Sequence, residues 1–240
     1  MQETTAGYWR KHLGVERSPD KNVFRQVKSP LRIFRPLILG TTYFIIDKLC
    51  DYRVVGLQNL KIKPPFILAS NHQSNLDYAF LIRKIPPETR SNLYSIATTW
   101  LLGNAVTQFV VKAGANCIFV DTKANFMEAL RVASDVLRLG KSVFIAPEGD
   151  RSYDGSIGEF KVGVGVLAVE NNVPIIPAKI DGTFRVLPRG KFFPRVGKKV
   201  TVSFGEPLYP DKFLAGKKEE NAYYNYKAVT DELKKRVVSL

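Results

Sequence analysis

Short apolar runs alternate with longer amphipathic patterns along most of the chain. The runs have the length of β-strands and lie at residues 52–56, 66–70, 93–97, 117–121, 142–146, 175–180 and 199–204. Patterns with helical spacing separate most of them, at residues 77–84, 103–112, 124–139, 161–170 and 223–238. Strands that alternate with helices predict an α/β fold, with a mostly parallel sheet flanked by helices. In such sheets, functional residues gather in the loops that follow the carboxyl ends of strands.

The first 49 residues do not follow this alternation. They predict a basic, amphipathic helical segment over residues 1–49 that faces a membrane, ahead of an α/β domain over residues 50–240. The longest apolar run of the segment, residues 36–46, is too short to cross a bilayer, which takes about 20 apolar residues. This run fits an ordinary buried helix and a helix lying in the membrane interface equally well.

Positive charge is concentrated in two short stretches. The chain has 240 residues, and 36 Lys and Arg against 22 Asp and Glu give a net charge of +14. Residues 9–35 and residues 185–199 each carry a surplus of 6 positive charges, so together they hold 12 of the 14. Large apolar side chains such as Phe24 and Phe193 lie among these cations. This combination favours an anionic membrane surface over nucleic acid as the partner, and predicts a peripheral protein on the cytoplasmic face of a membrane.

The loop between the second predicted strand and the following helix carries candidate chemistry. His72 lies in this loop, and Asp77 follows five residues later at the start of the helix. An imidazole whose tautomer is fixed by a carboxylate is a general base suited to neutral pH. In the alternative interpretation, Asp77 or Asn75 only caps the helix, and His72 is a surface residue. The sequence contains no Gly-x-Ser-x-Gly motif and no cysteine in a catalytic setting, so the base would act directly on a substrate hydroxyl or on water.

A second candidate loop follows the fifth predicted strand, at residues 147–160. Arg151 and Lys161 could hold a phosphate, and Gly149 would allow close approach of the backbone. Glu148 could orient Arg151 or bond to an acceptor hydroxyl. A solvated turn with an internal ion pair is the alternative. Two cysteines and two histidines in the whole chain exclude a disulfide framework and a multi-histidine metal centre, and we predict no metal site.

Four ordered segments resemble the signature blocks of the glycerolipid acyltransferases, the superfamily of 1-acylglycerol-3-phosphate acyltransferases. Asn71-His72, four residues and Asp77 resemble the first block. Residues 144–152, FIAPEGDRS, resemble the third, usually written F-P-E-G-T-R-S. Residues 114–121 and 173–177 occupy the places of the second and fourth. The match covers roughly residues 50–210, and the later LPRG and FGEPL segments also resemble bacterial members, including domains fused to acyl-activating ligases.

This resemblance implies an acyltransferase domain over residues 50–240 and a mechanism. His72 would take the proton of an acceptor hydroxyl and Asp77 would orient it, while the hydroxyl attacks the thioester of acyl-CoA or acyl carrier protein. A lysophospholipid or related glycerolipid would be the acceptor, and no cofactor beyond the acyl donor is implied. Residues 173–177 would support the acyl site. The residues expected to bind substrate are Glu148, Gly149, Arg151, Ser152, Lys161 and Lys112.

Two departures from the family pattern bear on the acceptor. Thr122 stands where the second block commonly has Arg, and Asp150 stands where the third has Thr. If both face the headgroup, the site is two charges less positive, which predicts an acceptor less anionic than lysophosphatidic acid. In the alternative, Asp150 pairs with Arg151 at the loop surface, and Lys123 or Lys112 replaces the missing Arg.

Two other functions remain open at this point. A thioesterase or lipid hydrolase would use His72 to activate water. A non-enzymatic domain would bind anionic membranes or nucleic acid through the +14 charge alone.

Overall fold

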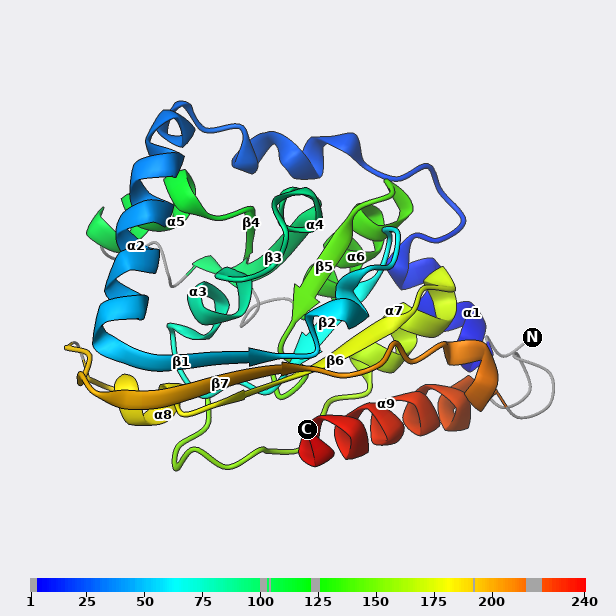
Figure 1. The fold of residues 1–240 in the computed structure, drawn as a ribbon. Coiled ribbons are helices and arrows are strands. Elements are labelled where there is room, and N and C mark those ends of the chain that lie inside the picture. The colour runs from blue at the N-terminus through cyan, green and yellow to red at the C-terminus, as the bar shows by residue number, and fades with distance from the viewer. Residues whose placement is uncertain (1–3, 100–102, 104, 122–125, 192, 215–221) are drawn as a thin grey trace.

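The computed structural model describes residues 4–99, 103, 105–121, 126–191, 193–214 and 222–240. Within these residues, seven strands form one sheet in the order β1-β7-β6-β2-β5-β3-β4 (Figure 1). The strands are β1 (Cys50–Val55), β2 (Ile67–Ser70), β3 (Leu93–Thr98), β4 (Cys117–Val120), β5 (Ser142–Ile145), β6 (Ile175–Asp181) and β7 (Lys198–Phe204). Each predicted strand therefore has its counterpart.

Helices cover both faces of the sheet. They are α1 (Thr5–Leu13), α2 (Arg35–Leu49), α3 (Asp77–Ile82), α4 (Pro87–Ser91), α5 (Ala105–Gly114), α6 (Phe126–Arg138), α7 (Gly163–Asn171), α8 (Thr183–Val186) and α9 (Ala222–Ser239). Helices α1, α6, α7 and α9 pack on one face, and α2 and α3 on the other. The predicted fold class is confirmed. Residues 124 and 125 of one predicted helix, Thr122, Lys123 and Phe192 lie outside the described residues.

Alternation along the central strands builds two cores. Ile67 and Ala69 of β2 pack with the first group of helices, while Leu68 between them packs with the second. All four residues of β2 are buried, which explains why the sequence has a continuous apolar run here and not an alternating one. The loop after β2 therefore starts from the middle of a rigid sheet.

The direction of two strands was not apparent from the pattern. β7 pairs with β6 in the antiparallel sense and with β1 in the parallel sense. The other five strands run parallel to one another. Apolar runs indicate burial and not direction, so the pattern could not show that β7, with β1 beside it, runs antiparallel to β6.

The N-terminal segment has two structurally different parts. Ala6 and Leu13 of α1 are fully buried in the core with α6, α7 and α9. Arg10 forms an ion pair with buried Glu170 at 2.9 Å, and Arg17 with buried Asp135 at 2.6 Å. The cations of α1 and the turn after it are thus used in packing against the domain. The proposed division at residue 49 stays a prediction.

Helix α2 is the other part of the segment. Ile46 is buried against the sheet, but Leu37, Phe44 and Ile45 are exposed, as is Ile33 in the 3₁₀ turn Pro30–Phe34 before it. Figure 1 shows α2 at the end of the molecule opposite α1 and α9. None of the helices in the described ranges has the length and apolar character needed to cross a membrane. Exposure of so many apolar side chains on one helix favours the interfacial interpretation over the buried one.

Candidate active site

The loop after β2 is fixed to the neighbouring strand by Asn71. The Asn71 side chain donates to the carbonyl of Ile180 and accepts from its N–H, both at 2.8 Å. These bonds replace two ladder bonds that β2 stops making after Ser70, and they tie the loop to the end of β6. The next residue, His72, is thereby held at the carboxyl edge of the sheet.

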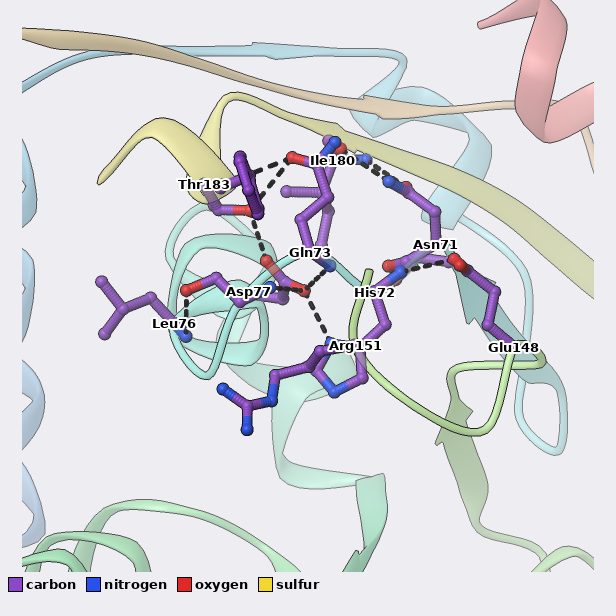
Figure 2. Close-up of polar contacts among 12 residues, drawn as sticks. Asn71, His72, Gln73, Leu76, Asp77, Glu148, Arg151, Ile180 and Thr183 are labelled. Atoms are coloured by element: carbon purple, nitrogen blue, oxygen red, sulfur yellow. Dashed lines mark hydrogen bonds and ion pairs between the residues drawn. The ribbon is translucent and has the colours of Figure 1, made fainter. Parts of the chain in front are cut away.

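His72 and Asp77 meet directly. The imidazole Nδ1 lies 2.7 Å from Oδ2 of Asp77, and that oxygen also accepts from the N–H groups of Gln73 at 2.7 Å and Ser74 at 2.9 Å (Figure 2). Asp77 is buried, whereas the His72 side chain is 29% exposed. Asp77 does not cap α3, because the N-cap residue is Leu76 and no side chain bonds there. With Nδ1 on Asp77, Nε2 is the nitrogen that remains for a substrate proton.

Glu148 and Ser152 hold the backbone of His72 from the second loop. One carboxylate oxygen of Glu148 accepts from the N–H of His72 at 2.8 Å, and the other accepts from Gly158 at 2.9 Å. The N–H of Ser152 donates to the His72 carbonyl at 2.8 Å. The Ser152 hydroxyl bonds within its own turn, to Asp154 and the N–H of Gly155. The third block therefore positions the histidine, a use that the sequence interpretation of Glu148 missed.

Gly149 and Lys161 also lie together in this second loop. Gly149 has φ +77°, and a Cβ built there would be 2.6 Å from Nζ of Lys161. The positive φ favours glycine at this position, and the Lys161 side chain, which is flexible, passes close over it. The Lys161 N–H donates to the carbonyl of Pro147 at 2.9 Å, which places its exposed ammonium beside the loop.

Arg151 is drawn with the His72–Asp77 pair in Figure 2, and the charge of Asp77 acts to raise the pKa of Arg151. Burial and the charge of nearby Arg189 lower the pKa of Arg151. Arg189 donates to Asp150 at 2.8 Å and to the Arg151 carbonyl at 2.9 Å. Partial burial acts to raise the pKa of Asp150, but the bonds from Arg189 and from the Arg151 N–H outweigh it, and the pKa is lowered. Asp150 therefore forms an ion pair with Arg189, while the charges of Asp150 and Arg151 also act on each other.

Lys112 is not brought to the other candidates. It lies in the last turn of α5, just before β4 begins, whereas His72 follows the end of β2. These positions belong to opposite edges of a parallel sheet. Residues 173–177 enter β6, where Val173, Ile175 and Ile176 are buried in the core. In the described ranges, no group of three or more His, Cys, Asp or Glu side chains is arranged to hold a metal ion.

Three residues of the site could not be identified as site residues from the sequence pattern. Gln73 bonds to the Gly155 carbonyl, Thr183 bonds to Asp77, and Arg189 pairs with Asp150. Arg189 belongs to the LPRG segment, which resembles bacterial family members. Thr183 and Arg189 both follow Asp77 by more than 100 residues, so no local pattern links them to it. Only the return of β6 to the side of β2 brings them there.

The sheet and its two loops bring a histidine–carboxylate pair to one edge of the fold, and comparison with known proteins identifies the family. The family model described as Acyltransferase matches residues 51–181, more than half of the chain. The chain therefore belongs to the Acyltransferase family, and the predicted enzyme class, an O-acyltransferase, is confirmed.

Named relatives agree with this assignment. A probable 1-acyl-sn-glycerol-3-phosphate acyltransferase of Mycoplasma pneumoniae is 29% identical over 194 residues, 75% of this chain and 70% of that protein. The 1-acyl-sn-glycerol-3-phosphate acyltransferase alpha of Mus musculus is 32% identical over 156 residues, 61% of this chain and 50% of its own length. The crystal structure of PlsC, the 1-acyl-sn-glycerophosphate (LPA) acyltransferase of Thermotoga maritima, has the same fold, with TM-score 0.60 and 24% identity over 100% of this chain and 99% of that one.

Proposed function

We propose that this enzyme transfers a fatty acyl group from an acyl thioester to the free hydroxyl of 1-acyl-sn-glycerol 3-phosphate. The observation that carries the proposal is the His72–Asp77 pair at 2.7 Å, with the charge of Arg151 close enough to interact with Asp77. The names of the relatives support the choice of acceptor. Both acyl-CoA and acyl carrier protein would supply the same thioester.

The reaction follows from the position of the imidazole. Nε2 of His72 takes the proton of the acceptor hydroxyl as its oxygen bonds to the thioester carbonyl carbon. The tetrahedral intermediate then breaks its carbon–sulfur bond, and the thiolate recovers the proton from Nε2. Asp77 stabilises the imidazolium formed between these two steps. No covalent bond to the protein is needed.

The acceptor phosphate would lie against Arg151 and Arg189. Arg189 lies close enough to lower the pKa of Arg151, and two neighbouring guanidinium groups suit a phosphate, because each presents paired N–H donors. Arg189 also offsets the negative charge of Asp150. The expected deficit of two positive charges is therefore reduced, and with it the argument for an acceptor less anionic than lysophosphatidic acid.

An apolar cavity provides space for acyl chains. It has a volume of about 190 Å³ and lies between α2, α3 and the segment after α8. Leu76, next to Asp77, is one of its walls, and Ile45 of α2 is another. An acyl chain entering from the membrane side of α2 would reach the catalytic loop through apolar surroundings.

The membrane would contact the exposed apolar side chains of α2 together with the loop before β7. Phe193 in that loop is 88% exposed and Phe44 in α2 is 63% exposed, while Lys191 is an exposed cation beside Phe193. The cavity walls include Ile45 from α2 and Arg195 from the loop, so the two elements are neighbours. Such a surface suits peripheral attachment to anionic lipid, which we place on the cytoplasmic face.

Incubating the purified protein with labelled acyl-CoA or acyl carrier protein and a panel of lysolipids tests the proposal. We expect labelled phosphatidic acid as the main product, with little free fatty acid in the absence of acceptor. His72→Ala should lower kcat by a factor on the order of 10²–10⁴ while acceptor binding persists. Acceptor-independent release of fatty acid would instead identify a hydrolase. Near-normal turnover by His72→Ala would exclude the mechanism.

A further inference from the structure

The two oxygens of Asp77 have different partners. Oδ2 accepts three hydrogen bonds from its own loop, including the one from His72. Oδ1 accepts from the hydroxyl of Thr183, at 2.5 Å (Figure 2). Within the described part of the chain, Thr183 is the one hydrogen-bond partner of Oδ1. Both residues are buried, so water does not readily replace this bond.

The turn at Gly182 and the side chain of Gln73 fix the position of Thr183. Gly182 before it has φ +102°, and a Cβ there would lie 2.1 Å from the Lys199 carbonyl oxygen, so the chain can turn here only with glycine. Oε1 of Gln73 accepts from the Gly182 N–H at 3.2 Å, and Nε2 of Gln73 donates to Gly155 at 2.7 Å. The start of α8 is thus tied to the loop that carries His72.

The Thr183 hydroxyl is not needed by α8 itself. The N-cap of this short helix is Gly182, which has no side chain, and it is Gln73, not Thr183, that accepts from the Phe184 N–H in the first turn. A second tie joins the other end of α8 to the catalytic loop, since the Ser74 hydroxyl donates to the Leu187 carbonyl at 2.8 Å. Removing the Thr183 hydroxyl would leave this second connection in place while taking the donor away from Asp77.

We propose that Thr183 is a positioning residue for acyl transfer, and that its hydroxyl fixes the rotation and the charge distribution of the Asp77 carboxylate that orients His72. This inference rests on the proposed function. The hydroxyl stops the carboxylate from turning about its Cβ–Cγ bond. It also places a positive dipole end on the anion, which limits how strongly Asp77 stabilises the imidazolium.

The sign of the effect on His72 follows from electrostatics. Without the hydroxyl, Asp77 would hold the imidazolium more strongly, and the pKa of His72 would rise. Because the base must be neutral to act, the acid limb of the kcat/KM profile would move to higher pH. The other charged groups that face His72, Arg151 and Glu148, are the same in every variant compared.

Thr183→Val and Thr183→Ser separate the hydroxyl from the shape of the side chain. We expect Thr183→Val to lower kcat by about tenfold with little change in acceptor KM, because the Asp77 carboxylate is no longer held in the rotation that aligns His72, and this loss outweighs the stronger base. Thr183→Ser should restore most of the activity. Thr230→Val is the matched control, since buried Thr230 donates to the Tyr226 carbonyl in α9, away from the site.

Histidine NMR gives a readout that a merely structural role would not move. The chain has two histidines, so a His12→Gln background leaves the His72 resonance alone. Thr183→Val in this background should shift the His72 titration midpoint upward by several tenths of a pH unit or more, and Thr230→Val should not shift it. If Thr183→Val does not fold, Thr183→Cys, whose thiol is a weak donor, should shift the midpoint in the same direction.

The outcomes distinguish this inference from the proposed function. An unchanged titration midpoint and unchanged kcat in Thr183→Val would overturn the role of Thr183 while leaving the His72 mechanism intact. Lost activity with an unchanged midpoint and a raised KM would reduce Thr183 to a structural residue. Full activity in His72→Ala would exclude the mechanism on which the inference rests, and absence of acyl transfer to 1-acyl-sn-glycerol 3-phosphate by the unaltered protein would overturn the proposed function itself.

Discussion

The two basic stretches have the same surplus of charge and different structural uses. In residues 9–35, Arg10 and Arg17 reach inward to carboxylates that are almost wholly buried. In residues 185–199, Arg185 and Arg189 pair with carboxylates whose side chains are more than half exposed. The first stretch stabilises the packing of α1, and the second lies beside the catalytic loops. Equal charge along the sequence therefore says little about which surface meets a membrane or a substrate.

Deletion of residues 1–27 should have the largest effect. It removes Ala6 and Leu13 from the main core and takes the arginine partner from buried Glu170. Buried Asp135 loses Arg17 and keeps the 3.9 Å contacts with Arg131 and Arg138. We expect the truncated chain to lose cooperative thermal unfolding, as followed by circular dichroism. A truncated protein with the melting temperature of the full chain would show that the first stretch is a separable arm, as the predicted division at residue 49 implies.

Arg10→Met measures the structural use of one cation. Glu170 would keep its bond from the Tyr226 hydroxyl but lose the charge that balances it. We expect a loss of about 3 kcal/mol in the free energy of unfolding, measured with urea, since a buried carboxylate is left unpaired. Activity per folded molecule should be unchanged. A large loss of kcat with normal stability would contradict the comparison.

Arg189→Met should lower activity and leave stability almost unchanged, the reverse of Arg10→Met. The ion pair with Asp150 is exposed, so the melting temperature should change little. The kcat/KM for 1-acyl-sn-glycerol 3-phosphate should fall on the order of tenfold, because a phosphate contact is lost. An uncharged monoacylglycerol acceptor serves as the control substrate and should be used as before. Equal losses for both acceptors would exclude a phosphate contact at Arg189.

Lys191→Gln should give the smallest effect. One cation near an anionic membrane contributes about 1 kcal/mol, or roughly fivefold in vesicle binding. The loss should appear with vesicles that contain phosphatidylglycerol and should shrink as salt rises. Lys21→Gln is the matched control, because exposed Lys21 lies in the first stretch, in the 3₁₀ turn Lys21–Val27 that packs near α6. Equal weakening by both substitutions would mean that net charge alone governs binding.

Much of the fold was available in the sequence. Apolar runs predicted the seven described strands, because β2 and β4 are buried on both faces, while β1 and β3 alternate, with one face more buried than the other. Spacing placed α6, α7 and α9 to within a few residues where they are described. The family resemblance also depended on order and spacing, and the family match confirms it. These features are local, or depend only on the order of segments along the chain.

The tertiary structure decided which of the candidate residues meet. His72 and Asp77 are five residues apart, and their loop could have been predicted to bring them together. Glu148, Thr183 and Arg189 reach the same loops only because β5 and β6 lie on either side of β2, a pairing that no local pattern encodes. Lys112, equally basic in the sequence, is carried to the other edge by α5. Composition supplied the charges, and long-range strand pairing determined which of them became part of the site.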